Sequence, residues 1–156
     1  GSGTTTYLLA TLLHGKEDLT VVTDSFPVAN ELYQDPGITV YIAGGWIMKR
    51  NSSCRGVSAE QFFRQLTVDK SYCSADSIDV NVGTSSIDFD PRTEICVSKC
   101  GADRYVLVDS SIRASRKALI FLYPVVNGFT FSRTFMFFLC SASSFFLLSS
   151  ESVFIF

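Results

Sequence analysis

The strongest constraint in this sequence is a glycine- and hydroxyl-rich segment that leads directly into an apolar helical pattern. Residues 1–6 read Gly-Ser-Gly-Thr-Thr-Thr, and leucines follow at positions 8, 9, 12 and 13. This spacing is typical of a helix, which we expect to begin near Thr4 or Thr5. Its free backbone N–H groups, the hydroxyls and the positive end of the helix dipole suit an anion such as phosphate or carboxylate. The alternative interpretation is that Ser and Thr only cap the helix, without a ligand.

A second unit of the same kind follows. Leu19–Thr23 has the composition of a buried strand, Asp24 and Ser25 end it, and a helix is predicted over 26–33. The side chains predicted to share one face of this helix are Phe26, Ala29, Leu32 and Tyr33. In a parallel sheet, both helix N-termini would lie at the carboxyl edge of the strands, where open α/β sheets bind ligands.

Strands and helices continue to alternate, which predicts a parallel, doubly wound sheet. Gly44 and Gly45 follow a strand directly, so they either form a turn or allow the backbone to approach a ligand closely. Ser58 is the predicted N-cap of the third helix. The remaining predicted elements are strands at 38–43, 69–75, 104–108 and 118–123, helices at 59–66 and 93–101, and polar loops at 46–56 and 76–92.

The length, net charge and cysteine spacing of the chain limit the classes of protein to which it can belong. A chain of 156 residues fits one domain, and a net charge of −2 gives no electrostatic footprint for nucleic acid. The five cysteines lack paired spacing, which favours reduced cytoplasmic thiols over a disulfide framework.

We predict neither metal nor cofactor. The aspartates at 76, 79, 88 and 90 are interpreted as solvated loop carboxylates, because they lack the Gly and Glu of a calcium loop. Glu94 and Lys99 are interpreted as an exposed helix pair, and His14 as favourable at a helix C-terminus.

Five short motifs, in this order, resemble the C-terminal sensor domain of DeoR-type bacterial transcription regulators. They are GSGTTT at 1–6, LTVVTDS at 19–25, IAGG at 42–45, RGVSAE at 55–60 and VLVDSS at 106–111. The resemblance covers roughly residues 1–123. It implies a Rossmann-like, open, mostly parallel sheet with helices on both faces, related to ribose-phosphate isomerases and CoA transferases. It also implies a non-catalytic, homo-oligomeric regulator that binds a phosphorylated sugar or related metabolite.

The resemblance also implies a winged helix-turn-helix that binds DNA. Because the chain has no initiator Met and begins inside a motif, we expect a fragment from which that segment is missing. Three positions depart from the family pattern. Gly1 stands where Asp is usual, Asp24 replaces a frequent Asn, and Ile112 stands where Lys is often found, with Arg113 next.

The predicted ligand-binding residues come from the opening loop, from neighbouring strand ends and from the predicted helix 93–101. Hydroxyls and N–H groups of the opening loop would hold the phosphate, and Asp109 would accept hydrogen bonds from sugar hydroxyls. The full predicted set is Ser2, Gly3, Thr4, Thr5, Thr6, Thr23, Asp24, Ser25, Gly44, Gly45, Lys99 and Asp109.

We expect residues 1–126 to form the sensor domain and 127–156 to be an atypical tail rich in Phe, Ser and Leu. A frameshift or read-through would explain its composition. A membrane helix at 135–148 is the second interpretation of this tail, but the segment is shorter than the ~20 residues that a membrane span needs. Poorly packed strands are the third interpretation. We therefore predict no membrane partner.

Two other functions stay open. One is a phosphosugar isomerase, which needs an acid and a base in the loop after the strand 69–75. The other is a decayed gene product that binds no ligand.

Overall fold

The computed structural model describes residues 1–79, 83–88, 90–109, 121–123, 134–139 and 154–155. Its first half alternates helices and strands: α1 (Thr4–Thr11), β1 (Leu19–Thr23), α2 (Phe26–Leu32), β2 (Ile38–Ile42), β3 (Trp46–Met48), β4 (Ser53–Arg55) and α3 (Val57–Arg64). The second half contains β5 (Val68–Ser74), β6 (Ser77–Asp79), β7 (Gly83–Ser86), α4 (Arg92–Cys100), β8 (Gly101–Asp109), β9 (Phe121–Tyr123), β10 (Thr134–Leu139) and β11 (Phe154–Ile155).

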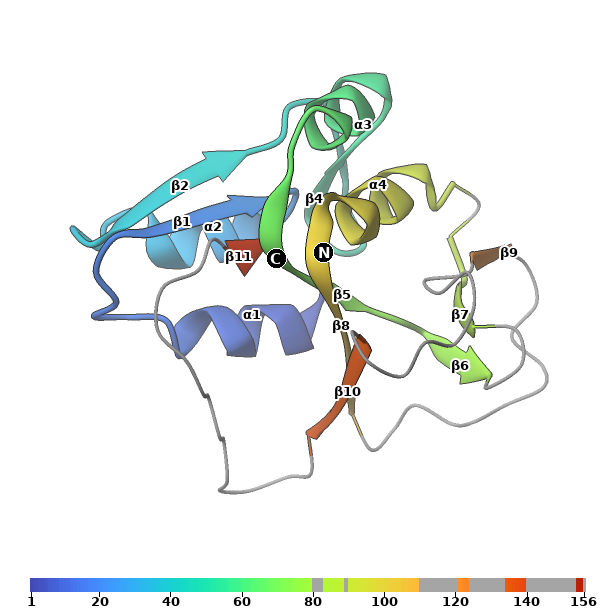
Figure 1. The fold of residues 1–156 in the computed structure, drawn as a ribbon. Helices are drawn as coiled ribbons and strands as arrows, with labels where there is room; N and C mark the ends of the chain where they lie inside the picture. The colour runs from blue at the N-terminus through green and yellow to red at the C-terminus, as the bar shows by residue number, and fades with distance from the viewer. Residues whose placement is uncertain (80–82, 89, 110–120, 124–133, 140–153, 156) are drawn as a thin grey trace.

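A six-stranded sheet organises these elements (Figure 1). Its order is β10-β8-β5-β11-β1-β2, and every neighbouring pair runs parallel. Two smaller antiparallel sheets accompany it, formed by β3-β4 and by β6-β7-β9. The protein is therefore a mixed α/β fold with a parallel main sheet.

Apolar side chains cover both faces of the main sheet, because successive residues of a strand point to opposite sides. Val21 and Tyr72 belong to a core cluster with residues of α1 and α2, whereas Val22 and Cys73 belong to a second cluster with residues of α3 and α4. The rings of Tyr72 and Tyr105 stack with their centroids 4.8 Å apart. Two helices thus pack on each face, as Figure 1 shows.

The helices and the strands β1, β2, β5 and β8 agree with the sequence predictions, but both predicted polar loops are wrong. The main sheet also contains β10 and β11, which lie in the segment interpreted as an atypical tail. Residues 46–56 contain the hairpin β3-β4, and residues 76–92 contain β6 and β7. These strands are three or four residues long, so they give too few alternations for a period to be read. Of the last predicted strand, 121–123 form β9, and 118–120 lie outside the described residues.

Two details of the helices also need correction. The N-cap of α3 is Gly56 with φ 103° and not Ser58, so the helix begins two residues earlier than predicted. In α2 the buried side chains are Val28 and Leu32, while Phe26 and Tyr33 are 44% and 59% exposed. The predicted apolar face is therefore right for Leu32, which is buried, and wrong for Phe26 and Tyr33.

The cysteines at 54, 73, 96 and 100 are free and buried, which confirms the prediction for these four. Cys140 lies outside the described residues. Burial raises the pKa of the Cys73 thiol to about 11. Burial also raises the pKa of Cys54 and Cys100, so these three thiols are protonated at neutral pH and are poor nucleophiles.

The helices in the described part of the chain are all too short or too polar to cross a bilayer. Residues 135–139 of the alternative membrane-helix segment belong to the strand β10, which pairs with β8. Residues 140–148 lie outside the described part. The predicted boundary between a sensor domain at 1–126 and a tail at 127–156 stays a prediction.

Candidate functional site

The opening loop forms the N-terminus of α1 without a side-chain cap. Gly3 is the N-cap residue, with φ 130°, and no side chain caps the helix there. The Thr6 hydroxyl donates to the Gly3 carbonyl at 2.8 Å. Capping by Ser or Thr, one of the two interpretations of this segment, is therefore wrong. The first backbone N–H groups of a helix have no partner within it, so this end of α1 can bind an acceptor.

The segment after β3 lies against this helix end because β4 docks beside the end of β1. The Cys54 N–H donates to the Asp24 carbonyl at 2.7 Å, and the Phe26 N–H donates to the Ser52 carbonyl at 2.9 Å. Asn51 Nδ2 then donates to the Ser2 hydroxyl at 2.9 Å. The hairpin that sequence patterns missed thus supplies one wall of the site.

A pocket of about 290 Å³ opens between α1, the hairpin and the end of β5. A second pocket of about 360 Å³ borders the same loop and reaches Thr4 and Ser25. The residues that line both pockets are Gly3, Arg50 and Asn51. The remaining lining of the first pocket is Ser2, Ser74, Ala75, Asp76, Ser86, Ile87 and Glu94.

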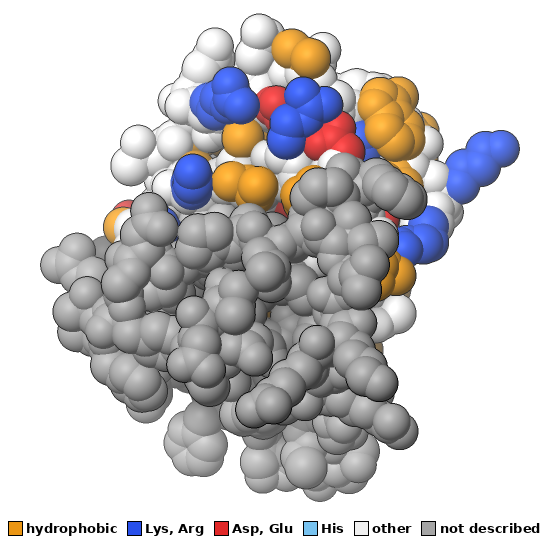
Figure 2. Space-filling model, turned by 90° about the vertical axis from the view of Figure 1, so that its right-hand side faces the viewer, with side chains coloured by type: hydrophobic (Ala, Val, Ile, Leu, Met, Phe, Trp, Pro, Cys, Tyr) orange, Lys and Arg blue, Asp and Glu red, His pale blue; other side chains and the backbone are white. Residues whose placement is uncertain are grey.

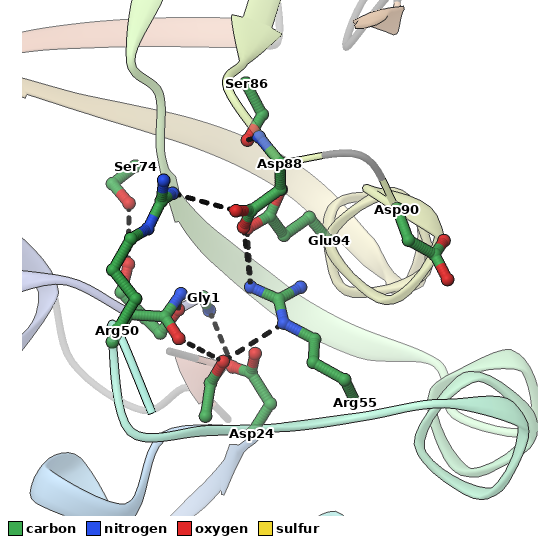
Figure 3. A network of polar contacts seen from close by, with 12 residues as sticks. Gly1, Asp24, Arg50, Arg55, Ser74, Ser86, Asp88, Asp90 and Glu94 are labelled. Carbon is green, nitrogen blue, oxygen red and sulfur yellow. Dashed lines mark hydrogen bonds and ion pairs between the residues drawn. The ribbon is translucent and has the colours of Figure 1, made fainter. Parts of the chain in front are cut away.

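Arg55 is the centre of a buried charge network behind this pocket (Figure 3). Its side chain is 2% exposed, and its Nη2 lies 2.6 Å from Oε1 of Glu94 and 3.8 Å from Oδ2 of Asp88. Its Nε donates to the Ser53 hydroxyl at 3.0 Å. Burial alone would lower the pKa of Arg55, but Glu94, Asp24 and Asp88 outweigh it and raise the pKa. Arg55 is therefore a permanent cation.

The carboxylates around Arg55 differ in how many hydrogen-bond and ion-pair partners they have. Burial raises the pKa of Glu94 although Arg55 favours its charged form, and Oε2 of Glu94 is buried with no hydrogen-bond partner among the described residues. Asp88 also pairs with Arg50, whose Nη2 lies 2.9 Å from Oδ1. Asp24 is fully buried, and neither of its carboxylate oxygens has a hydrogen-bond partner in the described part. The interpretation of Asp88 and Glu94 as solvated groups is therefore wrong.

The structure brings only part of the predicted site together. Ser2, Gly3, Thr4 and Ser25 line the two pockets. Thr5, Thr6 and Thr23 are buried and line neither, and the Thr23 hydroxyl accepts a hydrogen bond from the Ser25 N–H at 3.0 Å.

The two glycines after β2 serve the hairpin. A side chain at Gly45, whose φ is 145°, would collide with the Arg55 carbonyl. Gly44 is exposed and lines neither pocket, so the structure favours the turn interpretation for both. Asp109 ends β8, and its side chain lies outside the described part.

Lys99 lies away from the opening loop. It lines another pocket, of about 480 Å³, between α3 and α4, together with Arg64 and Arg92. Lysine and arginine side chains appear separately on the side of the molecule drawn in Figure 2, around small acidic and apolar areas. The structure therefore does not place Lys99 with the other predicted ligand-binding residues.

Sequence reasoning missed Arg50, Asn51 and Arg55 and misjudged Glu94. The Arg55 side chain lies within the motif RGVSAE, so the only signal was a charged residue directly before a glycine. Its partner Glu94 is 39 positions away, and no local pattern connects the two. In the described part of the chain, no three His, Cys, Asp or Glu side chains are arranged to hold a metal ion.

Comparison with known proteins gives one family. Residues 1–124 match the family model described as the DeoR C terminal sensor domain. The chain is 39% identical over 82 residues to the transcriptional repressor AccR of Agrobacterium fabrum, covering 53% of this chain and 32% of AccR. It is 31% identical over 127 residues to an HTH-type transcriptional regulator of Haemophilus influenzae, covering 80% of this chain and 48% of that protein. It is 29% identical over 110 residues to the HTH-type regulator YgbI of Escherichia coli, covering 70% and 43%. The chain spans a third to a half of these relatives.

Proposed function

Because this chain belongs to the family of DeoR C-terminal sensor domains, we propose that it binds a phosphorylated sugar and thereby controls a transcription regulator. One observation carries the proposal. The uncapped N-terminus of α1, the Arg50 guanidinium and the Asn51 amide border the same pocket. Each of these groups donates hydrogen bonds, and two of them carry positive charge, which suits a phosphate.

Other residues of the lining support a hydroxylated ligand. Ser74, Ser86 and Asp76 border the same pocket and offer hydroxyl and carboxylate oxygens. A volume of about 290 Å³ is near the lower end of ordinary small-molecule sites. A sugar phosphate therefore matches both the size and the polar character of the pocket.

The regulatory step follows from differential binding. A ligand between α1 and the hairpin favours the arrangement of these segments that holds it best, and shifts the population toward that arrangement. In the whole regulator, a DNA-binding segment would respond to that shift, most simply through a homo-oligomer in the cytoplasm. On this proposal the main sheet is a Rossmann-like sheet of the ribose-phosphate isomerase and CoA transferase type.

Thermal unfolding in the presence of sugars tests the proposal. Pentose and hexose phosphates should raise the melting temperature, and the same sugars without phosphate should not. At a concentration 100 times Kd, the expected stabilisation is ~2.7 kcal/mol. If no phosphorylated sugar changes the melting temperature, the proposed function is wrong.

A second function, a phosphosugar isomerase, is favoured by one observation. Glu94, whose pKa is raised by burial, borders the same pocket as Asp76, so an acid and a base face one ligand space. Incubation of the protein with pentose and hexose phosphates distinguishes the two functions. Isomerisation above ~1 per second that is lost on Asp76→Ala would establish the enzyme and overturn the sensor.

A further inference from the structure

The strand β2 forms one edge of the main sheet, and in the described part of the chain no strand pairs with its outer side (Figure 1). Its five residues, Ile-Thr-Val-Tyr-Ile at 38–42, include neither a charged residue nor a proline. Proteins often protect an open edge with such residues, because unpaired backbone groups can pair with another strand. The edge formed by β2 lacks that protection.

The hydrogen bonds between β1 and β2 show which backbone groups of β2 point away from the sheet. At one end, the Leu19 N–H donates to the Gly37 carbonyl at 3.1 Å. At the other end, the Ala43 N–H donates to the Thr23 carbonyl at 2.8 Å. Because alternate residues of a strand face the same neighbour, the odd-numbered residues of β2 bond to β1. The even-numbered residues 38, 40 and 42 therefore direct their N–H and C=O groups outward.

The three outward-facing residues are arranged symmetrically about Val40. If two β2 strands pair antiparallel about a two-fold axis at this residue, Val40 exchanges two hydrogen bonds with its own copy. The Ile42 N–H then reaches the Ile38 carbonyl of the second copy. The Ile38 N–H needs no partner there, because it already donates to the Asp35 carbonyl at 3.1 Å.

The side chains of β2 match under the same two-fold relation. Ile38 and Val40 pack with the core cluster of α1 and α2, so Thr39 and Tyr41 project from the other face of the sheet. Both of these side chains are exposed. In the antiparallel pair, Thr39 lies directly opposite Tyr41 of the second copy, on the same face. Two copies therefore meet along β2 without opposed like charges.

Exposed apolar side chains follow β2 in the chain. Ile42, Trp46 and Ile47 are each about half exposed, and the Trp46 ring lies against Gly56, which precedes the exposed Val57. A stable interface removes about 800 Å² per partner from water, which is more than a five-residue strand provides. These apolar side chains supply further area, and a second copy brings the same set.

We propose that β2 is an interface between two copies of this chain, which pair antiparallel about Val40 and join their main sheets into one continuous sheet. A second copy is favoured over an unrelated partner because the bonding pattern and the uncharged residues of β2 are complementary to themselves. The inference needs no ligand and does not depend on the proposed sugar-phosphate site. It adds the surface through which a change in one subunit reaches the other.

Sedimentation equilibrium over a wide range of protein concentration tests this inference, and we expect the unmodified chain to form a dimer. Thr39→Lys combined with Tyr41→Lys places like charges opposite each other across the interface and should weaken dimerisation at least tenfold. Thr39→Glu combined with Tyr41→Lys changes the same two exposed positions but brings opposite charges together. This second variant should dimerise at least tenfold more tightly than the first.

Amide hydrogen exchange gives a second measurement. The amides of Val40 and Ile42 should exchange at least tenfold faster in Thr39→Lys with Tyr41→Lys than in the unmodified dimer, because their partners are in the second copy. The amides of β1, which lies inside the sheet, should stay protected in both proteins. Their protection shows that the variant is folded.

Leu8→Lys is the control for the surface. Leu8 is exposed on α1, which packs mainly against α2, β5 and β8, so the substitution should not change dimerisation. A chain that is monomeric at every concentration overturns the inference, and so does a dimer that is equally stable in both double variants. A dimer lost only in Leu8→Lys also overturns it, because the interface would then lie on α1. Each of these outcomes leaves the proposed function in place, since that function is decided by the response to sugar phosphates.

Discussion

Nη2 of Arg55 lies 2.6 Å from Oε1 of Glu94, which joins the end of the hairpin β3-β4 to α4 across 39 positions of sequence. Both side chains are largely buried, at 2% and 15% exposure. The bond therefore fixes α4 relative to the segment that carries Arg50 and Asn51. Because both segments border the pocket, its shape depends on this one ion pair.

Removal of the cation should destabilise the fold. Arg55→Ala leaves Glu94 and Asp88 buried without their shared partner, and breaking a buried pair in this way costs about 3–5 kcal/mol. Urea unfolding should show this loss. Arg64→Ala is the control, because Arg64 is 63% exposed and its pair with Glu60 is worth at most about 1 kcal/mol. Equal losses for both variants would contradict the role given to Arg55.

Arg50 should contribute to ligand binding and little to stability. Its side chain is half exposed, and its ion pair with Asp88 is partly screened by solvent. Arg50→Ala should weaken binding of a sugar phosphate by about tenfold or more, since a charge-assisted contact is worth about 1.5–3 kcal/mol. Lys49→Ala, at the exposed neighbouring position that lines neither pocket, should not change the affinity. Similar effects of the two variants would indicate a general electrostatic attraction.

The pH dependence of stability should include a term from His14. Its pKa is raised by hydrogen bonds to Glu31, at 2.9 Å, and to Asp35, at 3.3 Å. A raised pKa stabilises the folded state fully below the ordinary value of about 6.5, and this stabilisation is lost as pH rises through the folded value. The free energy of unfolding should therefore fall as pH rises above about 6.5, and less steeply in His14→Gln. An unchanged slope in that variant would show that the ring contacts do not persist in solution.

A chain that ends at Asn127 tests the predicted domain boundary. Among the side chains that the structure describes, both core clusters consist of residues between Leu9 and Leu107, so the shortened chain keeps them. We expect cooperative unfolding to persist, at a lower urea concentration, because β11 no longer pairs with β1 and β5. A broad transition without cooperativity would mean that residues after 127 belong to the core.

Sequence patterns predicted the elements whose residues repeat over enough positions. The leucines after Thr6 predicted α1, and the apolar run Leu19–Thr23 predicted β1, because burial on a helix face or in a parallel sheet imposes a period on the chain. The order of the motifs, from GSGTTT to VLVDSS, indicated the family that the comparison over 1–124 shows. The short hairpins gave no such period and were missed.

Some features of the candidate site follow from local sequence, and others depend on tertiary contacts. The sequence by itself determined that the segment around Gly3 opens a helix, since only neighbouring residues are needed for that. Tertiary structure alone decided which side chains meet it. Arg50 and Asn51 reach the α1 N-terminus because β4 docks on β1, and Glu94 reaches Arg55 because α4 packs beside α3. These contacts join residues tens of positions apart, and a charged side chain becomes buried only where its partner arrives from another segment.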